Sequence, residues 1–274
     1  MPRVAALYRH PIKGFTPERL DELTIQSDGR VAGDRVLAFR FADAAQPEHR
    51  DGLDYWPKSK GLALESFPTL AALQVSYDHV ARRVRVTYDD TLLVDVVLDA
   101  DGREELTEIM TAFVLDSPEW KLLQREGRLP LVLVGDGEHA RFQDRSKGFV
   151  TLHSTASVDA VGDVLGQELD HRRFRSNVVI DGADAWDELA WTGEVRIGDV
   201  RFTAEGPIVR CLAPHANPDT GIRDARILTA LTRDIGLPEP TLGRLLLLQD
   251  VSGAVGDTGG TGGVIRVGDE VTVC

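Results

Sequence analysis

The sequence predicts a mainly β protein with several helices, an α+β fold, for a chain of 274 residues. Short apolar runs that alternate with polar residues recur along the chain and are separated by turn residues, a pattern typical of antiparallel strands. Residues 84–88 and 92–98 show it most clearly, with a turn at Asp89-Asp90 between them. Apolar residues at helical spacing are confined to a few short segments. A barrel is a natural way to close such strands.

Residues 1–115 are expected to form a small β-barrel-like domain. Its strands are predicted at residues 4–8, 23–25, 36–41, 68–76, 84–88 and 92–98. Pro11 ends the first strand, because proline lacks the N–H that a strand ladder needs, and Lys13-Gly14 forms a turn. A helix is predicted at 104–115, where the apolar residues lie on one face.

Residues 42–60 show neither the strand nor the helix period and are therefore predicted to be a long loop. Loops of this length in compact domains are often functional. Tyr55 and Trp56 could form a wall for a substrate, or the whole loop could be an excursion into solvent. The residues alone leave both interpretations open.

Residues 116–274 are expected to form the second domain. A helix is predicted to begin near Ser117-Pro118, since serine can cap a helix and proline suits its first turn. Further strands are predicted at 129–134, at 178–180 and in a hairpin around Gly198-Asp199, and further helices directly after Ser154 and over 225–237. The glycine-rich segment 253–263 lacks the lysine and hydroxyl of a phosphate-binding loop, so a hairpin loop is predicted there.

Composition places the chain among globular proteins, with 42% hydrophobic and 27% charged residues. No apolar run is long enough to cross a membrane, and the N-terminus has no apolar stretch of the kind found in signal peptides. A cytoplasmic location is therefore expected. The chain has two cysteines, which argues against a disulfide framework and for a reducing compartment.

The formal net charge is −13 at pH 7. A negative field over the whole protein repels nucleic acid and anionic membrane, so neither is expected as a partner. Local clusters of positive charge are correspondingly informative in this chain, whereas they would carry little information in a basic one.

The largest positive cluster is formed by Arg172, Arg173 and Arg175, just before a predicted buried strand. Each guanidinium can present a planar pair of donors to two oxygens, which suits a phosphate group. Lys13 and Arg35 lie at turns and could point inward at the same anion. Alternatively, the arginines are a solvated strand end and the lysine is an ordinary exposed turn residue.

Two further segments carry polar chemistry. Ser154-Thr155-Ala156-Ser157 precedes a predicted helix, where free backbone N–H groups and hydroxyls could bind an anion or simply cap the helix. Cys211 stands beside Arg210 and ahead of Asn217-Pro218-Asp219-Thr220-Gly221. Its thiol is either a reactive group next to a positive charge or a small buried hydrophobe.

The order of these segments resembles the MOSC domain, named after the C-terminal domain of molybdenum-cofactor sulfurase. Four strings are similar to the family's motifs: Phe174-Arg175-Ser176-Asn177, Ile197-Gly198-Asp199-Val200, Val209-Arg210-Cys211 and Asn217-Pro218-Asp219-Thr220-Gly221. Residues 8–14 and Gly33-Asp34-Arg35 resemble the start of the domain that precedes MOSC in many members. The resemblance implies a MOSC β-barrel at 116–274, preceded by a smaller N-terminal β-barrel-like domain at 1–115.

The resemblance also implies a cofactor. In amidoxime-reducing members of the family, one cysteine thiolate binds the metal of a molybdenum cofactor. Carried over by motif, that cysteine is Cys211, a soft ligand suited to a redox metal. The residues that would hold the pterin and its phosphate are Lys13, Gly14, Arg35, Ser154, Thr155, Ser157, Arg175, Asn177 and Arg210. Gly14 stands where the family commonly has serine, which removes one hydroxyl and puts that contact in doubt.

The activity implied by the resemblance is reduction of N-hydroxylated compounds, such as amidoximes and hydroxylamines, with external electrons. One alternative is a sulfur carrier or transferase that works through a persulfide on Cys211. Another is a non-catalytic carrier of the molybdenum cofactor. Pyridoxal phosphate, which a sulfur-loading step would use, is expected only on a separate partner.

A reductase of this kind is expected to need a separate redox partner, either a ferredoxin or a flavoprotein reductase. Two cysteines cannot hold a plant-type iron–sulfur cluster, which needs four. No glycine fingerprint of a dinucleotide site lies between a predicted strand and a helix. Electrons for a small-molecule substrate must therefore come from another protein.

Overall fold

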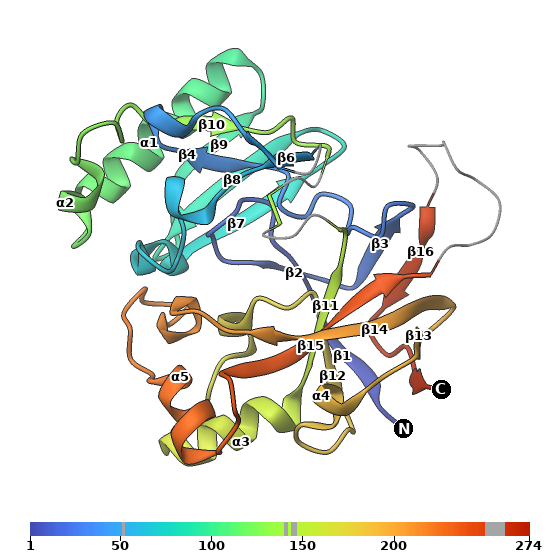
Figure 1. Ribbon diagram of the computed structural model, residues 1–274. Helices are drawn as coiled ribbons and strands as arrows, with labels where there is room; N and C mark the ends of the chain where they lie inside the picture. The colour runs from blue at the N-terminus through green and yellow to red at the C-terminus, as the bar shows by residue number, and fades with distance from the viewer. Residues whose placement is uncertain (51–52, 140–141, 144–146, 250–260) are drawn as a thin grey trace.

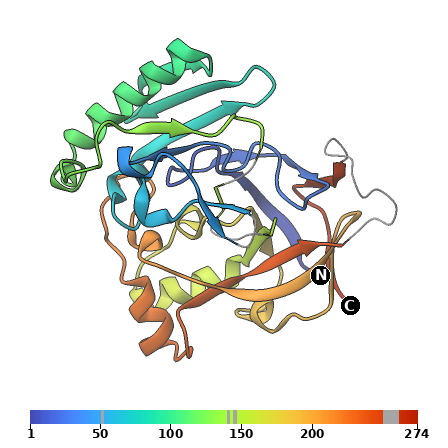
Figure 2. The ribbon, with the colours of Figure 1, turned by 45° about the horizontal axis from the view of Figure 1, so that its top comes forward.

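The computed structural model describes residues 1–50, 53–139, 142–143, 147–249 and 261–274. Figure 1 shows a smaller unit at the top, drawn mostly in blue to green, and a larger unit below it. Both termini lie close together at the larger unit in the two views (Figures 1 and 2). Within the described residues, no helix is both long enough and apolar enough to span a bilayer.

A sheet of eight strands runs through the larger unit. In spatial order its strands are β17 (Val271–Val273), β13 (Glu194–Ile197), β14 (Val200–Val209), β15 (Thr241–Leu248), β11 (Val150–Ser154), β12 (Val178–Asp181), β1 (Arg3–Arg9) and β2 (Glu18–Leu20). Neighbouring strands are antiparallel, except β11 and β12, which are parallel. The predicted mainly β fold with several helices is confirmed.

Alternate residues of these strands form the core of the larger unit. Leu7, Val178 and Phe202 are fully buried in one cluster, although they come from widely separated parts of the chain. Two more strands, β3 (Glu22–Gln26) and β16 (Thr261–Arg266), pair with each other and add Ile25 and Ile265 to the same cluster. Burial of these apolar side chains removes them from water and stabilises the sheet.

Helices cover one side of the larger unit. The helix α3 (Thr155–Leu165) begins at Ser154, whose side chain accepts a hydrogen bond from the N–H of Ser157, and ends at Gly166 in the left-handed conformation. Its buried face packs with α5 (Ile227–Thr229) and with the following π-helical turn, Ala230–Asp234. A short helix, α4 (Asp187–Ala190), places Glu188 in the interior.

The smaller unit is a three-stranded meander covered by a helix. Strands β7 (Leu73–Asp78), β8 (Arg83–Tyr88) and β9 (Thr91–Val97) are antiparallel neighbours. The helix α1 (Ala100–Leu115) lies across one face of this sheet, as Figure 2 shows, and α2 (Trp120–Leu123) follows it. The helix begins four residues before the predicted start, because Asp99 caps it by accepting a hydrogen bond from the N–H of Gly102 at 2.9 Å.

Strand pairing crosses the predicted division between residues 115 and 116 in both directions. The strand β10 (Val132–Val134) pairs with β4 (Ala38–Arg40) in the smaller unit. Conversely, β1 pairs with β12 in the larger unit, and β3 pairs with β16. Hydrophobic periodicity locates a strand along the chain but carries little information about its partner. The sequence therefore did not predict that strands would pair across the domain boundary.

Two local predictions are corrected by the structure. Residues 42–60 are not structureless, because they contain the hairpin of β5 (Glu48–Arg50) and β6 (Leu53–Tyr55), with 3₁₀ turns at Ala42–Ala44 and Lys58–Lys60. Pro68–Ala72 is a 3₁₀ helix and not the start of a strand. Three-residue strands are too short to show a period. Residues 253–260 of the glycine-rich segment lie outside the described residues, and the remainder begins β16.

Candidate functional site

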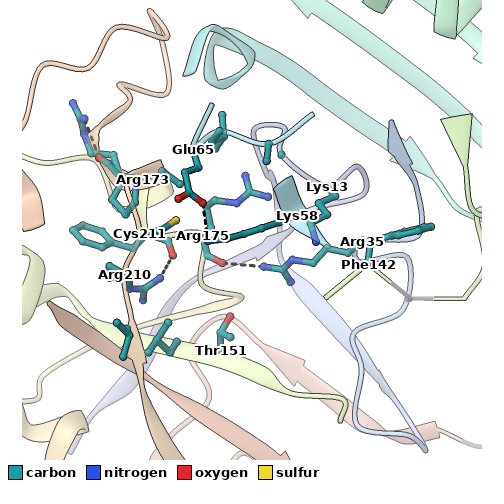
Figure 3. A pocket seen from close by; sticks show the side chains of 18 residues that line it. Lys13, Arg35, Lys58, Glu65, Phe142, Thr151, Arg173, Arg175, Arg210 and Cys211 are labelled. Carbon is teal, nitrogen blue, oxygen red and sulfur yellow. Dashed lines mark hydrogen bonds and ion pairs between the residues drawn. The ribbon is translucent and has the colours of Figure 1, made fainter. Parts of the chain in front are cut away.

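A pocket with a volume of about 210 Å³ lies where the two units meet. Figure 3 shows Cys211 toward its left side and Lys13 and Arg35 toward its right side. Segments from both units form the walls, which are lined by Lys13, Gly14, Arg35, Lys58, Ala63, Leu64, Glu65, Phe142, Thr151, Arg173, Phe174, Arg175, Ile208, Val209, Arg210, Cys211, Ala213 and Pro214. Six of the ten predicted site residues are among them.

Cys211 lies two residues after the end of β14 and is partly exposed in the pocket. Both cysteines are free thiols, and Cys274 is exposed. Ile208, Val209, Ala213 and Pro214 line the pocket on either side of Arg210 and Cys211 in the sequence. The thiol therefore lies among apolar lining residues and beside one arginine.

Arg210 is held by backbone carbonyls of the protein. Its Nε donates to the carbonyl of Leu242 at 2.8 Å, and Nη1 donates to the carbonyl of Phe174. Burial lowers the pKa of Arg210 to about 9, against opposing contributions from Cys211 and Glu188. Because its donors are used internally, Arg210 influences the pocket through its charge and by fixing the backbone around Cys211.

The opposite side of the pocket is a cluster of positive charge. Lys13, Arg35 and Arg175 all line it. Arg35 forms an ion pair with Asp34 and donates from Nη2 to the carbonyl of Arg175 at 3.2 Å. Arg175 donates to the carbonyl of Phe15. Both arginines have positive φ, 51° and 54°, a conformation that turns the chain sharply and is uncommon for residues other than glycine.

Gly14, the departure from the family's serine, has a structural explanation. Its φ is +85°, and a Cβ at this position would lie 2.9 Å from the carbonyl oxygen of Leu62. A side chain would therefore need both a strained backbone and movement of its neighbour. The backbone of Gly14 lines the pocket, but no hydroxyl can be supplied from here without rearrangement.

The buried carboxylate of Asp34 contacts Arg35, one of the positively charged residues that line the pocket. Asp34 accepts hydrogen bonds from the N–H of His10 at 2.7 Å and from Nδ2 of Asn177 at 3.3 Å, and it pairs with Arg35. Burial alone would raise the pKa of Asp34, but Arg35 and the hydrogen bonds from His10 lower it well below its usual range. Asp34 is therefore ionised and orients Arg35.

Asn177 supports the pocket without lining it. Its Oδ1 accepts a hydrogen bond from Thr151 Oγ1 at 2.8 Å, and its Nδ2 donates to the carbonyl of Tyr8 at 3.2 Å. Thr151 does line the pocket. Asn177 thus contacts a lining residue without reaching the pocket itself, and Thr151 on β11 lines the pocket where Asn177 was expected to.

Ser154, Thr155 and Ser157 do not line the pocket either. Ser154 Oγ and Ser157 Oγ lie 3.0 and 2.9 Å from the same carboxylate oxygen of Glu188, which is fully buried. Thr155 Oγ1 donates to Asp181 at 2.9 Å. An internal carboxylate therefore occupies the place at the start of α3 that an external anion would take, and of the two interpretations the structure shows the capping one.

The arginine cluster divides into three roles. Arg175 faces the pocket with Lys13 and Arg35. Arg172 pairs with Asp170 and Asp219. Arg173 lines the pocket but pairs with Asp224 at 2.7 Å. A crowd of arginines in the sequence could not show which of them already had carboxylate partners.

Several lining residues were not predicted. Lys58 and Glu65 form an ion pair at 2.7 Å and both line the pocket. Phe142 lines it too and packs edge-on against Trp56, with 5.3 Å between the ring centroids. Trp56, proposed as part of a substrate wall, therefore lies behind Phe142. Lys58 belongs to the predicted loop 42–60, for which a functional role and a solvent-exposed excursion were both left open, and this was the only signal available for it.

Comparisons with known proteins found a family model and several relatives. Residues 140–272 match the model of the MOSC domain. A molybdenum cofactor sulfurase from Drosophila grimshawi is 42% identical over 84 residues, which is 30% of this chain and 10% of that protein. The mitochondrial amidoxime-reducing component 1 of Mus musculus is 32% identical over 118 residues, 43% of this chain and 34% of that protein.

The matched part of the chain thus spans only a tenth to about a third of these relatives. A solved structure, that of the YuaD protein from Bacillus subtilis, superimposes with a TM-score of 0.42 at 11% identity and covers 99% of this chain and 94% of that one.

Proposed function

Because residues 140–272 match the model of the MOSC domain, we propose that the pocket binds a molybdenum cofactor and that the protein reduces N-hydroxylated compounds such as amidoximes and hydroxylamines. The named relatives support a function connected with the molybdenum cofactor, as a sulfurase of it and as an amidoxime-reducing component. The choice of reduction over sulfur transfer rests on the side chains that line the pocket.

The observation that carries the proposal is the pairing of chemistries in one pocket. A partly exposed thiol, Cys211, lies beside apolar lining residues and Arg210, and Lys13, Arg35 and Arg175 gather in the same pocket (Figure 3). Thiolate sulfur is a soft ligand suited to a redox transition metal. Guanidinium and ammonium groups suit a phosphate. A ligand with a metal at one end and a phosphate at the other fits this donor set.

The side chains of the chain would then have separate tasks. Cys211 would hold the metal, and Lys13, Arg35 and Arg175 would hold the phosphate. The apolar residues beside the cysteine would exclude water from the reacting group. A bound molybdenum cofactor supplies the two-electron chemistry that the lining side chains lack. Overall, the N–O bond of the substrate breaks, and two electrons and two protons convert the oxygen to water.

The electrons are proposed to come from a separate ferredoxin or flavoprotein reductase. Among the described residues, no group of three or more His, Cys, Asp or Glu side chains could hold another metal ion. The substrate is a small molecule that enters the pocket between the units.

A sulfur-transfer function is the second candidate, because the match to the molybdenum cofactor sulfurase is the most identical stretch reported above. It would use the same thiol, with Cys211 carrying a persulfide. The two functions differ in what the purified protein contains.

Metal analysis and turnover test these functions together. The protein is purified from a host that makes the molybdenum cofactor, and molybdenum, pterin and persulfide are measured per chain. Bound molybdenum with turnover of benzamidoxime by a reduced dye supports the reductase. Persulfide on Cys211 without molybdenum supports sulfur transfer, and molybdenum without turnover by any donor supports a carrier.

A further inference from the structure

The loop that follows Cys211 is tied to the arginine cluster by two ion pairs. Arg173 lies 2.7 Å from Asp224, and Arg172 lies 2.7 Å from Asp219. The side chains of Arg173 and Asp224 are 3% and 34% exposed, whereas those of Arg172 and Asp219 are 24% and 64% exposed. Removing Asp224 leaves the charge of a buried guanidinium uncompensated, while exposed ion pairs contribute little to stability. The inner pair, Arg173–Asp224, therefore constrains the loop more strongly than the outer pair, Arg172–Asp219.

Arg173 also holds the chain between Cys211 and Asp224. Its Nη1 donates to the carbonyl of His215 at 3.2 Å and lies 3.4 Å from that of Pro214. Pro214 lines the pocket on the same wall as the cysteine. One guanidinium thus fixes both the start and the end of the segment.

Asp224 closes this segment on itself. Its Oδ2 accepts a hydrogen bond from Asn217 Nδ2 at 2.7 Å, and its N–H donates to the carbonyl of His215 at 3.2 Å. The carboxylate therefore joins Arg173 on one side to the turn at Asn217 on the other. Loss of either oxygen's partner would loosen the whole turn.

The same loop reaches the smaller unit. Arg223 donates to the backbone carbonyl of Glu65, which lines the pocket. A Cβ on Gly221 would lie 2.6 Å from Cα of Thr69, so the two backbones are in close contact there. The position of the loop consequently affects two walls of the pocket.

We propose that Arg173 is a positioning residue: through its ion pair with Asp224 it sets the pocket wall beside Cys211 and the approach of the smaller unit to that wall. Arg173 precedes Arg175 by two residues, so the pair also links the thiol side of the pocket to the positively charged side. The relevance to a bound cofactor rests on the proposed function, but the geometry itself can be measured without any cofactor.

The test uses the full cofactor-free chain with Cys274→Ala, which leaves Cys211 as its sole cysteine. The rates of alkylation by iodoacetamide and by a bulky aryl maleimide are compared. An ordered wall admits the small reagent better than the large one. In Asp224→Asn and Arg173→Met, the ratio of bulky to small reagent rates should rise about tenfold, because the wall opens more often. Arg173→Lys should lie between these variants and the parent.

Two controls separate positioning from general destabilisation. Asp219→Asn makes the same chemical change on the exposed pair of the same loop and should leave the ratio unchanged. Val195→Ala, in a core cluster of the larger unit that contains no residue of this loop, lowers the melting temperature and should also leave the ratio unchanged.

An unchanged ratio in Asp224→Asn, or an equal rise in Asp219→Asn, overturns the proposal. If Arg173→Met does not fold, Asp224→Asn and Arg173→Lys decide the question. Absence of molybdenum in the parent protein would contradict the proposed function and leave this comparison intact.

Discussion

The carboxylate of Glu188 lies 2.9 Å from the hydroxyl of Ser157, at the first turn of α3 and away from the pocket. A helix N-terminus attracts negative charge, and here the charge is supplied by the protein itself. Glu188 is fully buried, so its hydrogen bonds to the serines and to the N–H of Ser154 are what make its burial tolerable. This contact turns a predicted ligand site into a structural one.

The serines at α3 should therefore matter for stability and not for cofactor content. Ser157→Ala removes a donor to a buried carboxylate, which costs about 1–3 kcal/mol of unfolding free energy. Chemical denaturation should show this loss, while molybdenum per folded chain stays at the parent level. Thr155→Ala, which removes only an exposed contact to Asp181, is the matched control. Loss of molybdenum from Ser157→Ala with unchanged stability would restore the ligand role.

Cys211→Ala should abolish molybdenum binding and turnover without unfolding the chain, because a metal ligand is lost while only a small, partly exposed side chain is trimmed. Metal analysis and activity with a reduced dye measure the two effects. Cys274→Ala is the control and should behave like the parent. Retention of molybdenum by Cys211→Ala would show that another group binds the metal.

Arg35→Ala and Arg175→Ala should each weaken cofactor retention. Losing a charge-assisted contact to a buried anion costs on the order of 2 kcal/mol, which corresponds to roughly thirtyfold weaker binding. Pterin content after extended dialysis reports the difference. Arg19→Ala, an exposed arginine outside this pocket, should retain the parent amount. Equal pterin content in all four proteins would contradict the assignment.

Stability should fall in mild acid partly because of His10. Burial, with the charges of Arg175 and Arg35, lowers the pKa of His10 to about 3, whereas an unfolded histidine titrates near 6.5. Between these values the unfolded chain binds a proton that the folded chain does not, so the unfolding free energy decreases as pH falls. His10→Gln should flatten this slope between pH 6.5 and 4 in urea titrations.

The purified chain should be inactive on benzamidoxime with NADH alone and active with a reduced dye or a reconstituted reductase. This expectation follows from the cysteine count, which is too low for a plant-type iron–sulfur cluster. Steady-state assays with each donor check it. Turnover with NADH and no second protein would refute the need for a partner.

Sequence reasoning located the elements of this site better than their contacts. The thiol of Cys211, the backbone of Gly14 and the charges of Lys13, Arg35, Arg175 and Arg210 meet in one pocket, as their motifs predicted. Ser154 and Ser157 lie at the start of a helix, and Asn177 directly precedes a strand, as their sequence patterns predicted. Whether such a polar side chain faces a ligand or an internal partner depends on residues far away in the chain.

The sequence by itself determined the mainly β fold, the capping of α3 and the motif order, because alternation, cap residues and turn residues act over a few neighbours. Only the tertiary structure decided which charges were paired across long distances in the chain. Glu188 reaches Ser157 across 31 positions, and Arg173 reaches Asp224 across 51. It also brought Lys58 and Glu65 from the smaller unit to the pocket that contains Cys211. Pairing of charges over such separations follows from strand order and packing, which no local pattern encodes.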